Sequence, residues 1–176
     1  MDWLLDLGRT FLNKERVIQI CKVLFVTLVL AVFADHNRII AQLLALIYDL
    51  GLATLCLALL VVVDKRNYKI HILGYYVIVT VIKGVYLFFI TSIGTEHGEL
   101  YQLIFVVSLV LHTITGFQLL KSEFSVIGKA FLYYLGGIII AAVLSASGID
   151  LPLMITHAIL LAILIYPFYK ELPKYY

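Results

Sequence analysis

The chain has 176 residues and a formal net charge of +2, with 63% hydrophobic residues, 14% charged residues and a mean hydropathy of +1.05. Soluble globular domains are roughly a quarter charged, so this composition excludes a water-soluble fold. With three prolines and no low-complexity run, a chain of this length has no room for a linker and a second domain of ordinary size. We therefore expect a single transmembrane domain over residues 1–176.

Residues 1–13 are predicted to form a short interfacial helix. At helical spacing, Leu4, Phe11 and Leu12 share one face, while Asp2 and Arg9 lie on the other. A helix of this kind lies on the inner leaflet, with its tryptophan at the depth of the lipid headgroups. A frayed amphipathic tail without a role is the alternative.

Six apolar segments follow, each near the length of about 20 residues that a bilayer core requires of a helix. The loops between them are short, and the runs are apolar on every side, whereas strands of a membrane barrel alternate over about ten residues. The sequence therefore predicts an all-α fold, a polytopic bundle of six transmembrane helices. The expected helices span residues 17–34, 39–63, 70–93, 100–120, 126–146 and 151–168.

The first apolar segment has a competing interpretation as a cleaved signal peptide. Val32 and Ala34 supply small residues at the spacing of a cleavage site, after a basic flank and an apolar run. The run is longer than the roughly 7 to 15 residues of a signal-peptide core. We expect the segment to be retained as a helix.

The orientation follows from the positive-inside rule, by which Lys and Arg in short loops stay in the cytoplasm. Arg38 is alone in the first, third and fifth loops, so both termini and the other two loops are predicted to be inside. We expect a multi-pass protein of a prokaryotic cytoplasmic membrane. The residues assigned to the inner side are Arg9, Lys14, Arg16, Lys65, Arg66, Lys69, Lys121, Lys129, Lys170 and Lys174.

Two charged residues fall near the bilayer midplane. Asp49 lies near the centre of the second predicted helix and Lys83 near the centre of the third, and one short loop joins these helices. A charge at a helix centre costs about 2.5 to 3.5 kcal/mol on insertion scales. We expect the two side chains to form an ion pair between antiparallel neighbours.

Polar residues at the same depth extend this candidate site. His112 shares a helical face with Ser108 and Thr115, and similar stripes run through the second and third helices. Ionisable groups in a membrane interior mark ion paths, proton relays or substrate sites. The alternative is an inert ion pair that fixes helix register, with the histidine bonded to a backbone carbonyl. The candidate binding or transport residues are Asp49, Lys83, His112, Thr80, Ser108 and Gln42.

The predicted outer loops are acidic and carry weak candidates for a divalent-cation site. Carboxylate and imidazole groups are ligands of such ions, although acidic outer loops also arise because basic residues are kept inside. We therefore predict no metal site and no cofactor. A haem held by His112 and His157 is not expected either, because their depths differ by roughly 9 Å. The weak metal candidates are Asp35, His36, Glu96, His97 and Glu99.

A stripe of small residues runs along the fifth predicted helix. Gly137, Ala141 and Ser145 recur every four residues, which lets another helix approach closely. We expect a packing surface, either internal or between protomers. Cys21 and Cys56 fall within helices and match no zinc or disulfide spacing, so they are expected to be packing residues.

The hairpin of the second and third predicted helices places an acid before a basic turn and a base after it. In this it is similar to small phosphate-starvation-inducible membrane proteins, a resemblance that implies no site residue. No Walker A loop, GxSxG elbow or HExxH motif is present. An enzyme is therefore less favoured than a non-enzymatic membrane protein.

We expect a small transporter or channel that moves protons or other cations, or is coupled to them, through the midplane site. One alternative is a non-catalytic subunit or scaffold of a larger membrane complex. A membrane-embedded lipid-modifying enzyme comes third. The expected partners are the lipid bilayer, a second copy of the chain or another membrane protein, and a small ion as substrate; no nucleic acid is expected.

Overall fold

The structure is a computed structural model that describes residues 2–33, 38–66, 68, 70–93, 99–147 and 153–176. All regular structure in these ranges is helical, without a strand, so the predicted all-α fold is confirmed. The helices are α1 (Asp2–Phe11), α2 (Lys14–Phe33), α3 (Arg38–Lys65), α4 (His71–Ile93), α5 (Glu99–Leu120), α6 (Ser125–Ala146) and α7 (Leu153–Glu171), followed by the 3-10 helix η1 (Leu172–Tyr175).

Five of these helices, α2 to α6, are long and apolar enough to cross a membrane, which makes the chain a multi-pass membrane bundle. The predicted sixth span corresponds to α7, a helix of 19 residues, and its crossing stays a prediction. Helix α2 begins three residues before the predicted segment. The Asn13 side chain accepts a hydrogen bond from the backbone N–H of Arg16 at 2.9 Å, and such a bond starts a helix ahead of its apolar run.

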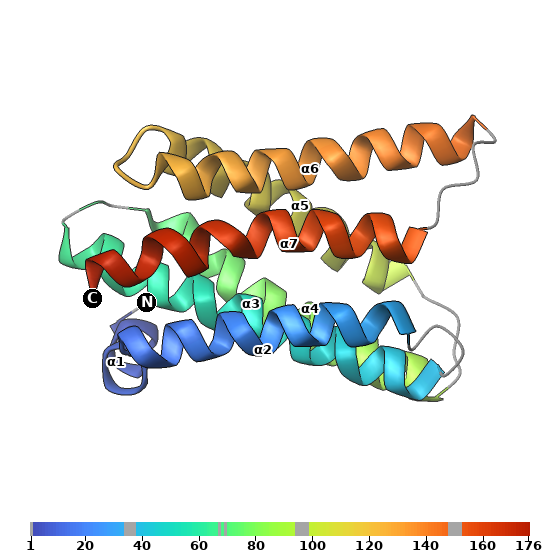
Figure 1. The fold of residues 1–176 in the computed structure, drawn as a ribbon, viewed down its shortest axis with the longest axis horizontal. Helices are drawn as coiled ribbons and strands as arrows, with labels where there is room; N and C mark the ends of the chain where they lie inside the picture. Colours follow the sequence, from blue (N-terminus) through green and yellow to red (C-terminus); the bar gives the residue numbers. More distant parts are fainter. Residues whose placement is uncertain (1, 34–37, 67, 69, 94–98, 148–152) are drawn as a thin grey trace.

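The six long helices form a closed, up-and-down ring. Each helix from α2 to α7 packs against its neighbour in the chain, and α7 closes the ring by packing against α2. Figure 1 shows the long helices side by side, with both termini at the same end of the bundle. An even number of antiparallel helices produces this arrangement. That end is the one predicted to be cytoplasmic, and the orientation itself stays a prediction.

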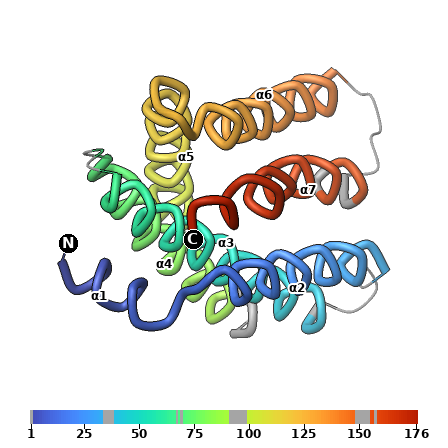
Figure 2. Tube along the Cα trace, turned by 60° about the vertical axis from the view of Figure 1, so that its left-hand side comes forward, coloured from blue at the N-terminus to red at the C-terminus, as the bar shows by residue number. Residues whose placement is uncertain are grey.

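Helix α1 is a separate short helix at the end that holds the termini (Figure 2). Its residues Leu4 and Gly8 are buried against α3, while Trp3 is 61% exposed. The side chain of Arg9 binds that of Asp64, at the end of α3, with an N–O distance of 2.7 Å. The predicted amphipathic helix is therefore present. Its position on the inner leaflet stays a prediction.

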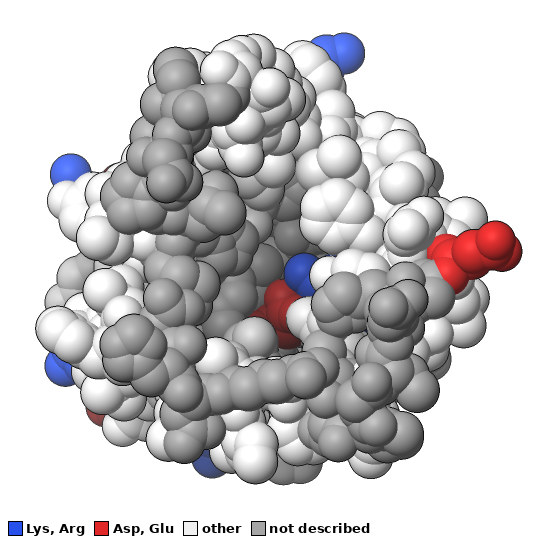
Figure 3. Space-filling model, turned by 90° about the vertical axis from the view of Figure 1, so that its right-hand side faces the viewer, with Lys and Arg blue, Asp and Glu red and all other residues white. Residues whose placement is uncertain are grey.

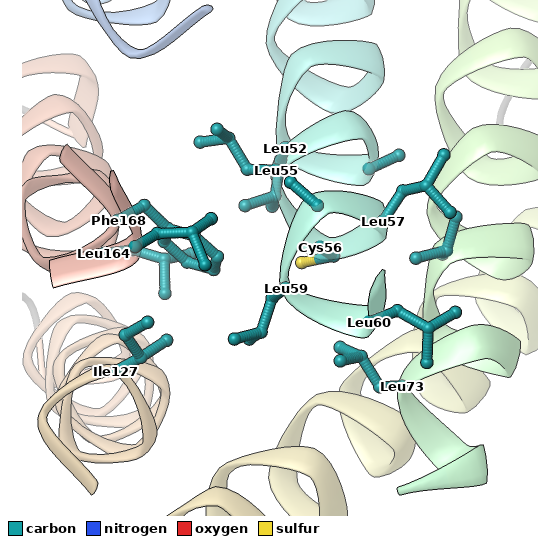
Figure 4. Close-up of a cluster of buried hydrophobic side chains, with 14 of the residues drawn as sticks. Leu52, Leu55, Cys56, Leu57, Leu59, Leu60, Leu73, Ile127, Leu164 and Phe168 are labelled. Carbon is teal, nitrogen blue, oxygen red and sulfur yellow. The ribbon is translucent and has the colours of Figure 1, made fainter. Parts of the chain in front are cut away.

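The core lies in the half of the bundle nearer the termini and is centred on α3. Residues 55–63 of α3 are all buried, so this part of the helix is surrounded on every side. Figure 4 shows Leu59 and its neighbours between Phe168 of α7, Ile127 of α6 and Leu73 of α4. Apolar surface on all sides of a helix is the pattern of a fully buried span. The half of α3 nearer its start carries several exposed residues instead.

The C-terminal residues cover this packed end. The Tyr176 hydroxyl donates a hydrogen bond to the backbone oxygen of Ala58 at 3.1 Å, and burial raises the pKa of that hydroxyl to about 12. The ring centroids of Tyr175 and Phe124 are 4.9 Å apart, and Phe124 lies at the turn between α5 and α6. These contacts tie the end of the chain to α3 and to the turn. The bundle is thus packed at one end, and its open space lies towards the other.

Candidate functional site

All six long helices line one cavity of about 490 Å³ inside the ring. Its volume is in the range of roughly 300 to 1,000 Å³ that holds small ligands in proteins. Seen from the end opposite the termini, the bundle is hollowed between the helices, and a basic and an acidic group lie at the bottom of the hollow (Figure 3). The polar residues that line the cavity are Thr27, Tyr48, Asp49, Tyr76, Lys83, Tyr101, Ser108, His112 and Tyr134.

The ion pair expected from the sequence is present. The Lys83 Nζ lies 2.9 Å from Asp49 Oδ1, and the side chains are 22% and 8% exposed. Asp49 lies about 16 Å from the start of α3, and Lys83 lies about 15 Å from the end of α4. Because the two helices are antiparallel neighbours, both side chains lie at nearly the same depth in the bundle. A β-carbon placed on Gly84 would come within 2.7 Å of Asp49 Cβ, so this glycine lets α4 approach the carboxylate closely.

His112 is held at both ring nitrogens. Its Nε2 lies 2.8 Å from the backbone oxygen of Phe131, which only accepts hydrogen bonds, so Nε2 carries a hydrogen and donates it. In the neutral ring, Nδ1 is then an acceptor, and the Tyr76 hydroxyl donates to it over 2.9 Å. The rings of Tyr76, Phe131 and Tyr134 surround the imidazole, with centroids 4.5 to 5.4 Å away. The backbone-carbonyl bond that the sequence interpretation offered as an alternative is therefore present.

The remaining predicted site residues divide into two groups. Ser108 is buried and lines the cavity, as the shared face with His112 suggested. Thr80 is also buried, but it is not among the lining residues, and its hydroxyl donates to the backbone oxygen of Tyr76 at 2.8 Å. Gln42 is half-buried and does not line the cavity either. The structure brings Asp49, Lys83, His112 and Ser108 together around one space.

Several tyrosines of the cavity were not predicted as site residues. Tyr48 precedes Asp49 in α3, and its hydroxyl is buried without a hydrogen-bond partner in the described structure. Tyr101 and Tyr134 line the cavity from α5 and α6. Because most tyrosines of membrane helices anchor at the interface, the sequence alone does not distinguish the few that face a cavity.

Two more polar side chains of α5 lie between the cavity and the end that holds the termini. Thr115 lies one turn beyond His112, and Gln118 one turn further. Each has a buried side-chain oxygen without a hydrogen-bond partner in the described structure. Other threonines in the bundle, such as Thr27 and Thr113, donate to the carbonyl four residues earlier. Buried polar atoms of this kind require a partner, often an ordered water.

Other predicted features lie elsewhere. Of the weak metal candidates, only Glu99 falls within the described residues, where it is exposed at the start of α5. Asp35, His36, Glu96 and His97 lie outside them. Among the residues that the structure describes, no three His, Cys, Asp or Glu side chains gather as metal ligands would. Both cysteines are buried and free, in keeping with a packing role.

The small-residue stripe of α6 is an internal packing surface at Gly137. A β-carbon there would meet Leu160 of α7 at 2.1 Å, so this glycine permits the two helices to pack closely. The adjacent Gly136 has open space in the same position, with nothing within 4 Å. Ser145 is exposed, near the far end of α6. The stripe therefore packs against α7 at Gly137, whereas its other end, at Ser145, is exposed.

No protein-family model, no curated protein and no solved structure matches the chain. The resemblance of the α3–α4 hairpin to phosphate-starvation-inducible membrane proteins consequently carries no residue assignment. The function has to be inferred from the cavity and its side chains.

Proposed function

We propose that the chain is a small membrane transporter or channel whose midplane site is the cavity around Asp49 and Lys83. The observation that carries the proposal is the position of this ion pair on the wall of a cavity that opens at one end of the bundle. A pair that served only to join two helices needs no access to an open space. This pair instead borders a space large enough for a small molecule or ion.

Protons, transported alone or together with a substrate, are the ions best suited to this site. When a proton moves from the Lys83 ammonium group to the Asp49 carboxylate, the ion pair becomes a neutral carboxyl group and a neutral amine. The net charge of the pair is zero before and after the transfer. The Tyr76 hydroxyl and the His112 ring form a second hydrogen-bonded pair on the wall of the cavity. The buried side-chain oxygens of Thr115 and Gln118 lie further along α5, towards the opposite end of the bundle.

A transporter requires that the cavity is open to one side of the membrane at a time. In this conformation the cavity opens away from the termini, while the half of α3 near the termini is packed on all sides. With the predicted orientation, this is an outward-facing state. The packed half then separates the site from the cytoplasm. Movement of a substrate requires that this half opens in turn.

The proposal is tested by proton and monovalent-cation flux in proteoliposomes, with an internal pH dye and an imposed membrane potential. Wild type is compared with Asp49→Asn, and Asp64→Asn is the matched control, because Asp64 lies in an exposed pair outside the cavity. We expect flux in the wild type and the control and none with Asp49→Asn, measured on protein that is shown to be folded. Absence of flux from the wild type under every gradient would contradict the proposal.

A non-catalytic subunit or scaffold of a larger membrane complex is the second candidate. It is favoured by the complete pairing of His112 and of the ion pair within the chain itself. Groups that are satisfied in this way need no ligand, and a buried pair fixes the register of two helices. In that case the wild type gives no flux, and affinity purification from the native membrane recovers a defined partner with the chain.

A further inference from the structure

The cavity offers both signs of charge to a ligand and no excess of either. Asp49 and Lys83 are the only charged side chains among the described residues that line it. They lie side by side on its wall, with 2.9 Å between nitrogen and oxygen. A ligand with one charge can bind one partner of this pair only by separating it from the other, which then stays uncompensated in a poorly solvated space. A ligand with both charges replaces one ion pair by two.

A tyrosine of the cavity wall supports a ligand that accepts hydrogen bonds. Tyr48 is 7% exposed, it lines the cavity and its hydroxyl has no hydrogen-bond partner in the described structure. It is the residue before Asp49 in α3. A buried hydroxyl without a partner is costly to keep, and a carboxylate is the strongest acceptor that a small ligand can bring to it.

Most of the remaining wall is apolar. Leu28, Leu52, Phe105, Leu109 and Leu161 line the same space from four different helices. Small-molecule sites combine such walls with a few placed polar groups that set the orientation of the ligand. A ligand of this cavity therefore has a charged head and an apolar body.

We propose that the cavity binds a small zwitterion that carries an ammonium group, a carboxylate group and an apolar side chain, as an amino acid does. The carboxylate binds Lys83 and accepts a hydrogen bond from Tyr48, and the ammonium group binds Asp49. The apolar part lies against the leucine and phenylalanine walls. The inference rests on the transport function proposed above only where it names this molecule as the substrate, since binding is measurable without transport.

Binding is tested by calorimetry on the whole chain in lipid nanodiscs, with alanine, leucine and phenylalanine as zwitterions of increasing apolar size. Two analogues share the phenylalanine skeleton: 2-phenylethylamine keeps only the ammonium group and 3-phenylpropanoate only the carboxylate. We expect phenylalanine to bind and each analogue to bind at least about thirtyfold more weakly, the factor for losing a buried charge partner. Equal or tighter binding of the amine, or no binding by any zwitterion, would overturn the proposal.

Tyr48→Phe separates binding from folding. The hydroxyl has no partner within the chain, so its removal leaves thermal stability unchanged or slightly higher, while phenylalanine affinity falls by about tenfold. Unchanged affinity would contradict the role of Tyr48. Flux measured on the same protein separates the two proposals. Proton flux that depends on Asp49, without zwitterion binding, contradicts the proposed ligand and supports the transport function. Zwitterion binding without any flux supports the proposed ligand and contradicts the transport function.

Discussion

Gly84 of α4 lies directly against Asp49 of α3, close enough that a β-carbon on the glycine would be 2.7 Å from Asp49 Cβ and 3.3 Å from Oδ2. Lys83, which pairs with Asp49, is the residue before this glycine. The close approach of the two helices and the ion pair are therefore parts of one arrangement. A larger residue at position 84 separates the helices at the depth of the cavity.

We expect Gly84→Ala to lower the free energy of unfolding by about 1 to 3 kcal/mol, because it overpacks a closely packed interface. Gly136→Ala is the matched control, since a β-carbon at that position has open space around it. Alanine is the better helix former by up to about 1 kcal/mol, so the control stays neutral or gains stability. The measurement is reversible unfolding in mixed micelles. Equal effects of the two substitutions on stability would contradict the close contact between Gly84 and Asp49.

The ion pair gives a second prediction, on stability. Asp49→Leu or Lys83→Leu alone strands a buried charge and is expected to cost about 3 to 5 kcal/mol. Asp49→Leu combined with Lys83→Leu leaves no charge and recovers most of that loss. The three variants and the wild type form a double-mutant cycle in the same unfolding assay. Additive losses in the double variant would mean that the two side chains do not interact.

The hydrogen bonds of His112 give a third prediction. Tyr76→Phe removes the donor to Nδ1 and leaves that nitrogen buried without a partner, at a cost of about 1 to 3 kcal/mol. Nitrogen NMR of histidine-labelled protein is expected to show the Nε2–H tautomer for His112 in the wild type. A weakened hydrogen-bond signature at Nδ1 is expected in Tyr76→Phe. An Nδ1–H tautomer in the wild type would be incompatible with the bond to the Phe131 carbonyl.

The predicted orientation is open to a labelling test. Cys21 and Cys56 are fully buried, and replacing both by alanine gives a background without thiols. In that background, Ser147→Cys lies at the end where the cavity opens, and Lys121→Cys lies at the end with the termini. Both positions are exposed. A membrane-impermeant maleimide added to intact cells is expected to label position 147 and spare position 121. The opposite pattern would invert the membrane orientation.

Much of the site followed from depth and helical spacing in the sequence. The pairing of Asp49 with Lys83 was predictable because a short loop makes α3 and α4 antiparallel neighbours and the two charges lie at one depth. Ser108 and His112 followed from their shared face. Thr80 and Gln42 were placed by the same spacing, but spacing fixes only the face of a helix. It does not show that the Thr80 hydroxyl bonds to its own helix backbone.

Other features depend on packing that spacing does not determine. The closure of the ring by α7 against α2 joins segments that are distant in sequence. The size of the cavity follows from this closure, as does the set of helices around it. The orientation of Tyr48 depends on side-chain packing against neighbouring helices, which no pattern in α3 reveals. Helix boundaries shifted by a few residues where a cap such as Asn13 begins a helix ahead of its apolar run.

The central claim is that the pair of Asp49 and Lys83 serves the cavity as well as the fold, and the double variant Asp49→Leu with Lys83→Leu tests it most directly. The measurement is proton and cation flux in proteoliposomes of the double variant beside the wild type, on protein whose stability matches. We predict flux for the wild type and none for the double variant, although it folds equally well. Flux at the wild-type rate in the uncharged, folded variant would contradict a transport role for the pair.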